Sequence, residues 1–217
     1  TGTPTYDMQV GSFFYNILDE NRCAVTCETS SYYTYRGPQV VVPDTVEYEG
    51  TRYLTTQIAK SAFRECHLIA QLEVNALTDT IASYACYNCY DLTSVKLPAA
   101  LTYIGTSAFY GCSSLTAVTC LATTPPEMAA KTCFSTTAFM GTLYVPEGSK
   151  TAYEADVLWC NFQNIEEIPA TAITPLSAWK PETQSDNIYT LDGKYAGTRL
   201  APLRPGVYVR GGKKVVK

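Results

Sequence analysis

The sequence contains little charge, a single histidine and no long apolar segment, and each of these deficits argues against a class of function. Charged residues make up 17% of the 217 residues, and the formal net charge is −4. Basic residues do not cluster except at the extreme C-terminus, so the basic stripe of a nucleic-acid-binding protein is missing. No apolar run approaches the roughly 18 residues that a membrane helix requires. Glycine-rich phosphate loops are absent as well, and we expect no cofactor.

The composition that remains is that of a strand-rich globular protein. Apolar residues make up 46% of the chain, and 17 tyrosines favour strands and exposed aromatic surface over helices. The chain begins at Thr1 without a methionine. We interpret this as a mature or trimmed chain from which an export signal or lipid anchor has been removed.

A short repeat organises the middle of the chain. The segments 58–66, 81–89 and 104–112 align without gaps, each from an isoleucine to a cysteine, and their constant spacing is called the repeat period below. The register continues downstream, where apolar positions such as Leu72 and Val95 are also one repeat period apart. One such unit has too few apolar residues to close a core, so we expect the units to stack with equivalent side chains lying over one another.

Each unit is expected to contain one strand and one tight turn. Residues 92–98 end in an alternation of apolar and polar residues that predicts a short half-buried strand, ended by Pro98. The spacing of Ala108, Phe109 and Cys112 predicts one helical or 3₁₀ turn on the opposite side. The fold class is therefore a β-rich solenoid with a short strand and a short helical turn in each repeat.

These residues resemble the BspA-like leucine-rich repeats of bacterial, Bacteroidetes-type surface proteins. The segment 97–118 follows the unit of that family almost throughout, from Leu97-Pro98 through Ile104-Gly105. The first two repeats depart from it, because alanine replaces the glycine and Cys86 replaces a phenylalanine. The resemblance covers about residues 35–168 and implies a leucine-rich-repeat solenoid with a closing unit, which begins at residues 141–146.

The segments on either side of the solenoid have other patterns. Residues 1–34 include two strand-like runs around Asp19-Glu20-Asn21-Arg22, which predict a β-hairpin and an N-terminal β cap. Residues 169–187 contain three prolines among polar residues and are interpreted as a linker. Residues 188–217 predict a small β module, with turns at Asp192-Gly193 and Gly211-Gly212.

The C-terminal module also carries a resemblance. Ile188-Tyr189, Gly206-Val207-Tyr208 and Lys214-Val215-Val216-Lys217 are similar to C-terminal sorting modules of proteins exported by Bacteroidetes. That resemblance implies a tail that is read during type IX secretion and takes no part in ligand binding. The alternative is a small accessory β domain.

Cysteine and histidine are the candidate chemical groups, and the repeat accounts for most of them. Cys86-Tyr87-Asn88-Cys89 has the spacing of a redox or zinc motif, but both cysteines occupy repeat positions that point inward. We therefore expect buried free thiols, no metal site and no disulfide ladder. His67 is the one candidate base for a hydrolase, and its equivalents in the next repeats predict an exposed turn residue instead. The chain is accordingly predicted not to be an enzyme, and no catalytic residue is assigned.

The outward face of the stacked strands is the candidate binding surface. Its polar positions recur once in every repeat, or follow by the offset of the closing unit, and proteins of this architecture bind ligands on such extended faces. The predicted ligand-binding residues are Gln71, Glu73, Ser94, Lys96, Thr119, Thr142 and Tyr144. The alternative is a merely solvated face on which Glu73 and Lys96 form a weak cross-strand pair.

Three functions are compatible with these features. The first is an adhesin-like module at the outer cell surface or outside the cell, with a host or bacterial surface protein, a matrix protein or a glycan as partner, as the resemblance implies. The second is a structural spacer or scaffold on the cell surface. The third is a hydrolase that uses His67. A patch that joins Tyr144 to neighbouring aromatic rings would favour binding, and an evenly polar strand face would favour the spacer.

Overall fold

The computed structural model describes residues 4–29 and 34–169, together with the backbone of four short strands between 188 and 216. The chain divides into two compact units, Thr1–Ile173 and Thr174–Lys217. The first unit contains the repeats. The linker expected over 169–187 lies outside the described residues, apart from Pro169.

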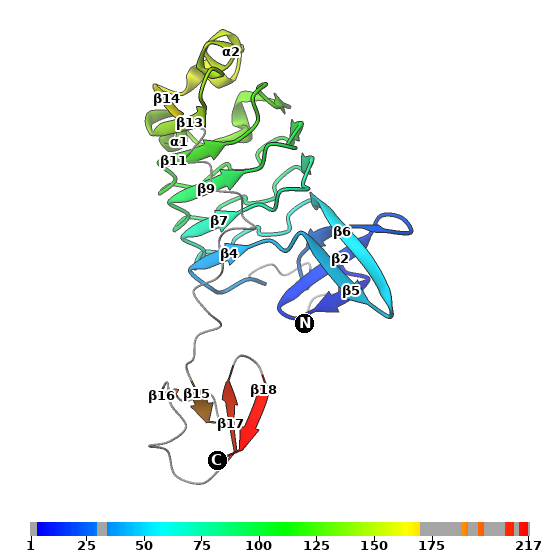
Figure 1. Ribbon diagram of the computed structural model, residues 1–217. Helices are drawn as coiled ribbons and strands as arrows, with labels where there is room; N and C mark the ends of the chain where they lie inside the picture. The colour runs from blue at the N-terminus through cyan, green and yellow to red at the C-terminus, as the bar shows by residue number, and fades with distance from the viewer. Residues whose placement is uncertain are drawn as a thin grey trace. The chain divides into compact units, whose positions relative to one another are not determined.

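One side of the first unit is a six-stranded parallel sheet (Figure 1). Leu72, Val95, Val118 and Leu143 are direct partners in neighbouring strands and are at most 3% exposed, so the expected stacking of repeats is confirmed. In sheet order the strands are β14 (Asn164–Ile168), β13 (Thr142–Pro146), β11 (Ala117–Cys120), β9 (Ser94–Leu97), β7 (Gln71–Glu73) and β4 (Gln39–Val41).

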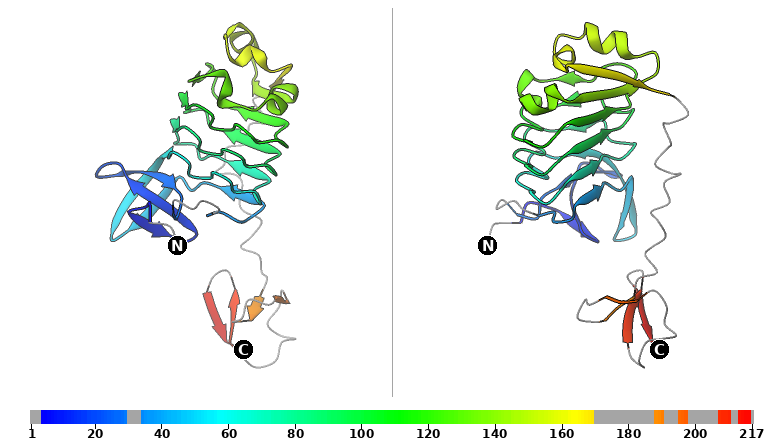
Figure 2. Two further views of the ribbon diagram at one scale, coloured as in Figure 1. Left: turned by 180° about the vertical axis from the view of Figure 1, so that it is seen from behind. Right: turned by 90° about the vertical axis from the view of Figure 1, so that its left-hand side faces the viewer.

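The second sheet of the solenoid repeats with the same period. Ile58, Ile81 and Ile104 are direct partners in three parallel strands, as the repeat predicts, and Met128 continues the row. The repeat strands of this sheet are β6 (Thr51–Ile58), β8 (Thr80–Ile81), β10 (Tyr103–Ile104) and β12 (Glu127–Met128). Figure 2 shows the repeats stacked one on another, with the core enclosed between the two sheets and the turns that connect them.

The tight turns of the repeats are not helical, and the prediction of a helical or 3₁₀ turn at 108–112 is wrong. The turns close with hydrogen bonds over three residues, such as Ala108 N to Gly105 O at 3.2 Å. The third residue of each turn has a left-handed backbone, with φ of 61° at Tyr84 and 57° at Ser107. A helix cannot contain such residues at this spacing, and backbone N–H groups donate to the next repeat instead, as Cys86 N does to Ala108 O at 2.6 Å.

The N-terminal segment adds antiparallel strands to the end of the second sheet. The expected hairpin is present, because β2 (Phe13–Ile17) pairs antiparallel with β3 (Arg22–Thr26), and β1 (Met8–Val10) pairs with β2. Strand β3 then pairs in parallel with β6. That this segment covers the end of the solenoid core as a cap stays a prediction.

Residues 45–58, which include an insertion relative to the central repeats, form a second hairpin. Strand β5 (Thr45–Tyr48) pairs antiparallel with β6. The two strands are joined at Glu49 and Gly50, which both have positive φ, of 49° and 79°. Paired positive φ values are typical of a tight hairpin turn. The insertion therefore adds β5 beside the first half of β6, and Ile58 at the end of β6 still pairs with Ile81 of the next repeat.

The last part of the first unit packs large aromatic side chains over the end of the core. Trp159 is fully buried, and its Nε1 donates to Pro126 O at 2.7 Å. Tyr153 is also fully buried and donates to Ala122 O at 2.7 Å. The helical elements here are η1 (Lys131–Cys133), α1 (Thr136–Met140), α2 (Lys150–Ala155) and η2 (Trp159–Asn161).

The second unit contains a four-stranded antiparallel sheet in the order β16-β15-β17-β18. Its strands are β15 (Ile188–Thr190), β16 (Tyr195–Gly197), β17 (Val207–Arg210) and β18 (Lys213–Val216). The two predicted turns, Asp192-Gly193 and Gly211-Gly212, fall between antiparallel neighbours but lie outside the described residues.

Candidate functional site

The seven predicted ligand-binding residues lie together on the outward side of the six-stranded sheet, which we call the strand face. One row along the face joins Glu73, Lys96, Thr119 and Tyr144 as direct partners in adjacent strands. The row beside it joins Gln71, Ser94 and Thr142, with Ala117 between the last two. Gln71 is exposed and the other six are half-buried, because neighbouring side chains in each row cover one another.

Glu73 and Lys96 form the predicted cross-strand pair. Lys96 Nζ lies 2.8 Å from Glu73 Oε1, and the two side chains are 34% exposed for Lys96 and 19% exposed for Glu73. An ion pair at such a partly solvated position contributes about 0.2–1 kcal/mol to stability. The pair therefore sets the charge pattern in the middle of the strand face more than it holds the fold together.

The strand face is longer than the seven predicted residues. Gln39 and Val41 precede the rows on β4, and Asn164 and Glu166 continue them on β14, where both are exposed. The last two were missed because β14 begins slightly earlier than the repeat period would place it, as the pairing of Thr142 with Asn164 shows. The polar-apolar alternation of 164–166 is the signal that could have found them.

Tyr144 has no aromatic neighbour on the strand face. Among the ring contacts of the described residues, none involves Tyr144. The partners of Tyr144 within its row are Thr119 and Glu166. Tyr144 therefore does not join an aromatic patch, and any case for binding depends on the polar rows of the strand face rather than on rings.

The two cysteines of the CxxC segment lie in the core, at the inward positions that the repeat predicts. Cys86 and Cys89 are each 1% exposed, and Cys89 Sγ donates to Phe63 O, in the preceding repeat, at 3.0 Å. Cys112 repeats this contact with Cys86 O at 3.1 Å. Burial raises the pKa of Cys86 well above its usual value, which opposes formation of a nucleophilic thiolate. No group of three or more metal-ligating side chains occurs among the described residues.

His67 is half-buried, so the prediction of an exposed turn residue is wrong. The His67 ring stacks on the ring of Tyr90, its equivalent in the next repeat, with centroids 4.8 Å apart and an interplanar angle of 10°. The prediction failed because a turn position in a solenoid is covered by the same position one repeat along. Cys66 follows the inward pattern, and burial raises its pKa to about 12, which opposes formation of a thiolate at the residue before His67.

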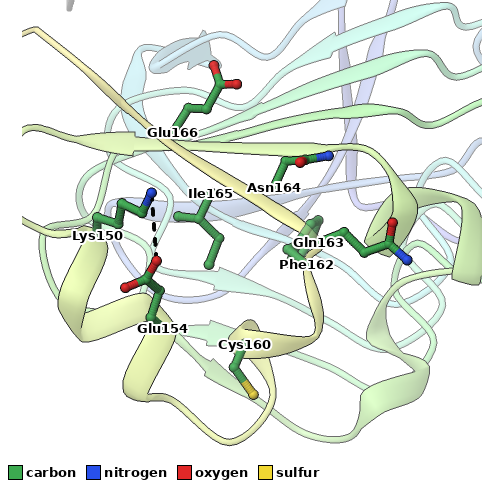
Figure 3. Close-up of a pocket in the computed structure, with 8 residues that line it drawn as sticks. All are labelled: Lys150, Glu154, Cys160, Phe162, Gln163, Asn164, Ile165 and Glu166. Atoms are coloured by element: carbon green, nitrogen blue, oxygen red, sulfur yellow. Dashed lines mark ion pairs between the residues drawn. The ribbon is translucent and has the colours of Figure 1, made fainter.

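A groove of about 480 Å³ opens beside the last strand of the solenoid (Figure 3). Lys150 and Glu154 of α2 lie on one side of it, with an ion pair of 3.7 Å, and β14 lies on the other. Its lining is mostly polar, and it adjoins the strand face because Asn164 and Glu166 belong to both. The groove is an open, polar hollow beside the strand face rather than an enclosed pocket for a small molecule.

Comparison with known proteins agrees with this architecture. The family model described as a BspA type leucine rich repeat region matches residues 50–170 in six copies. A leucine-rich repeat protein from Bacteroides capillosus is 27% identical, with a TM-score of 0.55 over 64% of this chain and 96% of that one. A second, from Bacteroides ovatus, is 19% identical, with a TM-score of 0.53 over 74% of this chain and 41% of that one. No curated protein is significantly similar to the chain.

Proposed function

The chain belongs to the BspA-type leucine-rich-repeat family, and from that premise we propose that it is an exported, non-catalytic protein that binds a macromolecular partner through its strand face. The observation that carries the proposal is the register of the strand face. Parallel strands hold two rows of polar side chains, with Lys96 and Glu73 near the middle and Tyr144 towards one end. A surface built on paired strands is ordered before it binds, so little conformational entropy is lost on association.

The chemistry of the strand face fits a polar partner with a broad contact surface. The face carries hydroxyl, amide, carboxylate and ammonium groups along several adjacent strands. Partners of this kind are surface or matrix proteins and glycans, as the family resemblance implies. A protein partner would form the polar, wet contact that is common in reversible recognition.

Several features support the absence of catalysis. Eight of the nine thiols that could act as nucleophiles are buried, and burial raises the pKa of Cys120 to about 11. The only histidine is stacked against Tyr90. A hydrolase needs an ionisable nucleophile beside its base, and Cys66, the residue before His67, is 1% exposed with its pKa raised to about 12 by burial.

The proposed location is the outer cell surface or the extracellular space. The support is the resemblance of residues 188–217 to a type IX sorting module, together with the family of the repeats. The four-stranded sheet of the second unit is compatible with a folded sorting module. None of the helices in the described part of the chain has the length and hydropathy of a membrane-spanning helix.

An array of matrix proteins and glycans, probed with the full chain, tests the proposal. Lys96→Glu and Tyr144→Ala should each weaken a genuine strand-face ligand at least about tenfold, which corresponds to about 1.4 kcal/mol. Lys60→Glu is the matched control, because Lys60 is an exposed lysine in a turn away from the strand face. Equal loss with Lys60→Glu would point to non-specific charge effects and would contradict a strand-face site.

The second candidate is a structural spacer, and the isolated position of Tyr144 favours it. A spacer needs a rigid stack but no recognition surface, and the packed repeat core supplies the stack. In that case no array component binds, and strand-face substitutions change neither display nor stability of the chain beyond about 0.5 kcal/mol.

A further inference from the structure

Aromatic side chains gather on a second surface, formed by the turns of the three central repeats, which we call the turn face. Tyr87 and Tyr110 are equivalent residues of adjacent repeats, and their rings stack with centroids 5.9 Å apart and an interplanar angle of 17°. The guanidinium of Arg64, one repeat earlier, lies 5.1 Å from the centre of the Tyr87 ring. Three repeats therefore build one row of flat groups: Arg64, Tyr87 and Tyr110.

A second, shorter row runs beside the first. His67 and Tyr90 stack in the same way, at 4.8 Å, and each lies one tight turn after Arg64 or Tyr87 in its repeat. The next equivalent position is Ser113, which is exposed and has no ring. The row of rings therefore stops at Tyr90, with a small hydroxyl residue at the position where the next ring would lie.

The terminal ring of each row is the exposed one. Tyr90 and Tyr110 are each 45% exposed, whereas Tyr87, within its row, is half-buried. A ring inside a stack has neighbours on both faces, but a terminal ring has a neighbour on one face only. Tyr90 has His67 on one face, and beyond its other face the repeat supplies only Ser113. The result is an aromatic shelf one ring wide, bordered by hydroxyl groups.

We propose that this shelf binds the apolar face of a neutral pyranose ring, as one unit of an oligosaccharide or surface glycan. Tyr90 is 45% exposed, and its equivalent one repeat along, Ser113, carries no ring, so the outer face of Tyr90 is open to a sugar ring. Axial C–H groups on the face of a pyranose carry partial positive charge, which suits the electron-rich face of tyrosine. The equatorial hydroxyls point outward in the plane of the ring, and the exposed Ser113 of the next repeat is a nearby hydroxyl residue in the sequence of the turn face.

Charge on the turn face favours a neutral sugar over an acidic one. Asp91 directly follows Tyr90 and is exposed, whereas Glu65, in the preceding repeat, forms an ion pair of 3.4 Å with Arg64. Arg64, the cation of the first row, is engaged with the Tyr87 ring. A carboxylated or sulfated sugar on the shelf would therefore be repelled by the Asp91 carboxylate, with Arg64 held in the neighbouring row.

The proposal uses a surface separate from the strand face, so the two sites can be tested separately. The probes are neutral hexasaccharides of glucose, mannose, xylose and N-acetylglucosamine, with a hyaluronan hexasaccharide as the acidic comparison, measured against the full chain by titration calorimetry. At least one neutral probe is expected to bind. Tyr90→Ala should weaken that binding at least about tenfold, and Tyr90→Phe should leave it within about threefold, because the phenyl ring keeps the shelf.

Val157→Ala, at an exposed residue between α2 and η2 that belongs to neither the strand face nor the turn face, is the control and should leave the affinity unchanged. Thermal unfolding of each variant verifies that the chain is folded, and Tyr90→Phe retains the stack with His67 in any case. The proposal is overturned if no neutral probe binds at about 5 mM, if only the acidic probe binds, or if Tyr90→Ala binds as well as the unchanged chain. Loss of binding with Tyr144→Ala alone would overturn it too, and would assign the sugar to the strand face.

Discussion

Replacing Phe109 by alanine tests the inward positions of the repeat. Phe109 is fully buried and stacks on Phe134 with ring centroids 5.1 Å apart and an interplanar angle of 8°. Burial of a phenylalanine side chain contributes about 1.5–3 kcal/mol, and the cavity left by its removal brings the cost to about 3–5 kcal/mol. Because Tyr110 is the next residue and is 45% exposed, Tyr110→Ala should cost less than about 1 kcal/mol.

Urea unfolding followed by circular dichroism measures both costs. With a slope of about 2 kcal/mol per molar urea, Phe109→Ala should lower the midpoint by about 2 M, and Tyr110→Ala by less than about 0.5 M. Cys86→Ala, at the position equivalent to Phe109 one repeat earlier, should fall between the two because a thiol fills less volume. A loss below about 1 kcal/mol for Phe109→Ala, or equal losses at 109 and 110, would refute the assignment of inward and outward positions.

Three further predictions concern the thiols and a close backbone approach. Since Cys160 is the only exposed cysteine of nine, a thiol reagent should titrate about one group in the folded chain and nine in urea; rapid reaction of several thiols before unfolding would contradict the packing. Burial raises the pKa of Cys66 to about 12 and of Cys120 to about 11, against an ordinary value of 9.0. As the pH rises, the unfolded chain therefore loses these protons before the folded chain does. The free energy of unfolding should not depend on these two thiols below about pH 9, and it should fall as the pH rises towards 11–12. Urea titrations at each pH measure this change. Gly105→Ala should destabilise the fold by about 1–3 kcal/mol, because a Cβ there would lie 2.4 Å from Ser83 N. Gly37→Ala is the control: its Cβ would meet its nearest neighbour at 3.5 Å, so the cost should stay within about 1 kcal/mol. Thermal melts of the two variants measure both costs.

The stacked strands could be predicted from the sequence because the repeat fixes them directly. Rows such as Leu72, Val95 and Val118 follow from the constant repeat period, and a shift of register by one would expose the whole row. The seven residues of the strand face follow from the same spacing and from the offset of the closing unit. Their position in the fold could therefore be predicted, although their role in binding is still a proposal.

The turns could not be predicted in the same way. Helical spacing at Ala108 and Cys112 suggested a helix, but Ser107 and Gly111 have positive φ values of 57° and 77°. Backbone hydrogen bonds to the next repeat compensate for that conformation, and such bonds form only once the repeats are stacked. A single repeat therefore contains too little information to specify its turn.

The aromatic rows of the turn face were also missed. Tyr87 and Tyr110 are one repeat period apart, but this signal lies at outward positions rather than at the apolar positions that define the core. His67 and Tyr90 are equivalent residues of different type, so the periodicity of residue type alone does not reveal their stacking. Periodic surface residues in a solenoid are as informative as periodic core residues.

Nuclear Overhauser contacts in the isotopically labelled full chain test the stacking of repeats most directly. The structure predicts cross-strand contacts between backbone protons of Leu72 and Val95, of Val95 and Val118, and of Ile81 and Ile104, each pair separated by one repeat period. The expected spectrum contains these contacts in every central repeat. Contacts displaced along the strands, or none across repeats, would contradict the stacked rows on which the strand face and the turn face both depend.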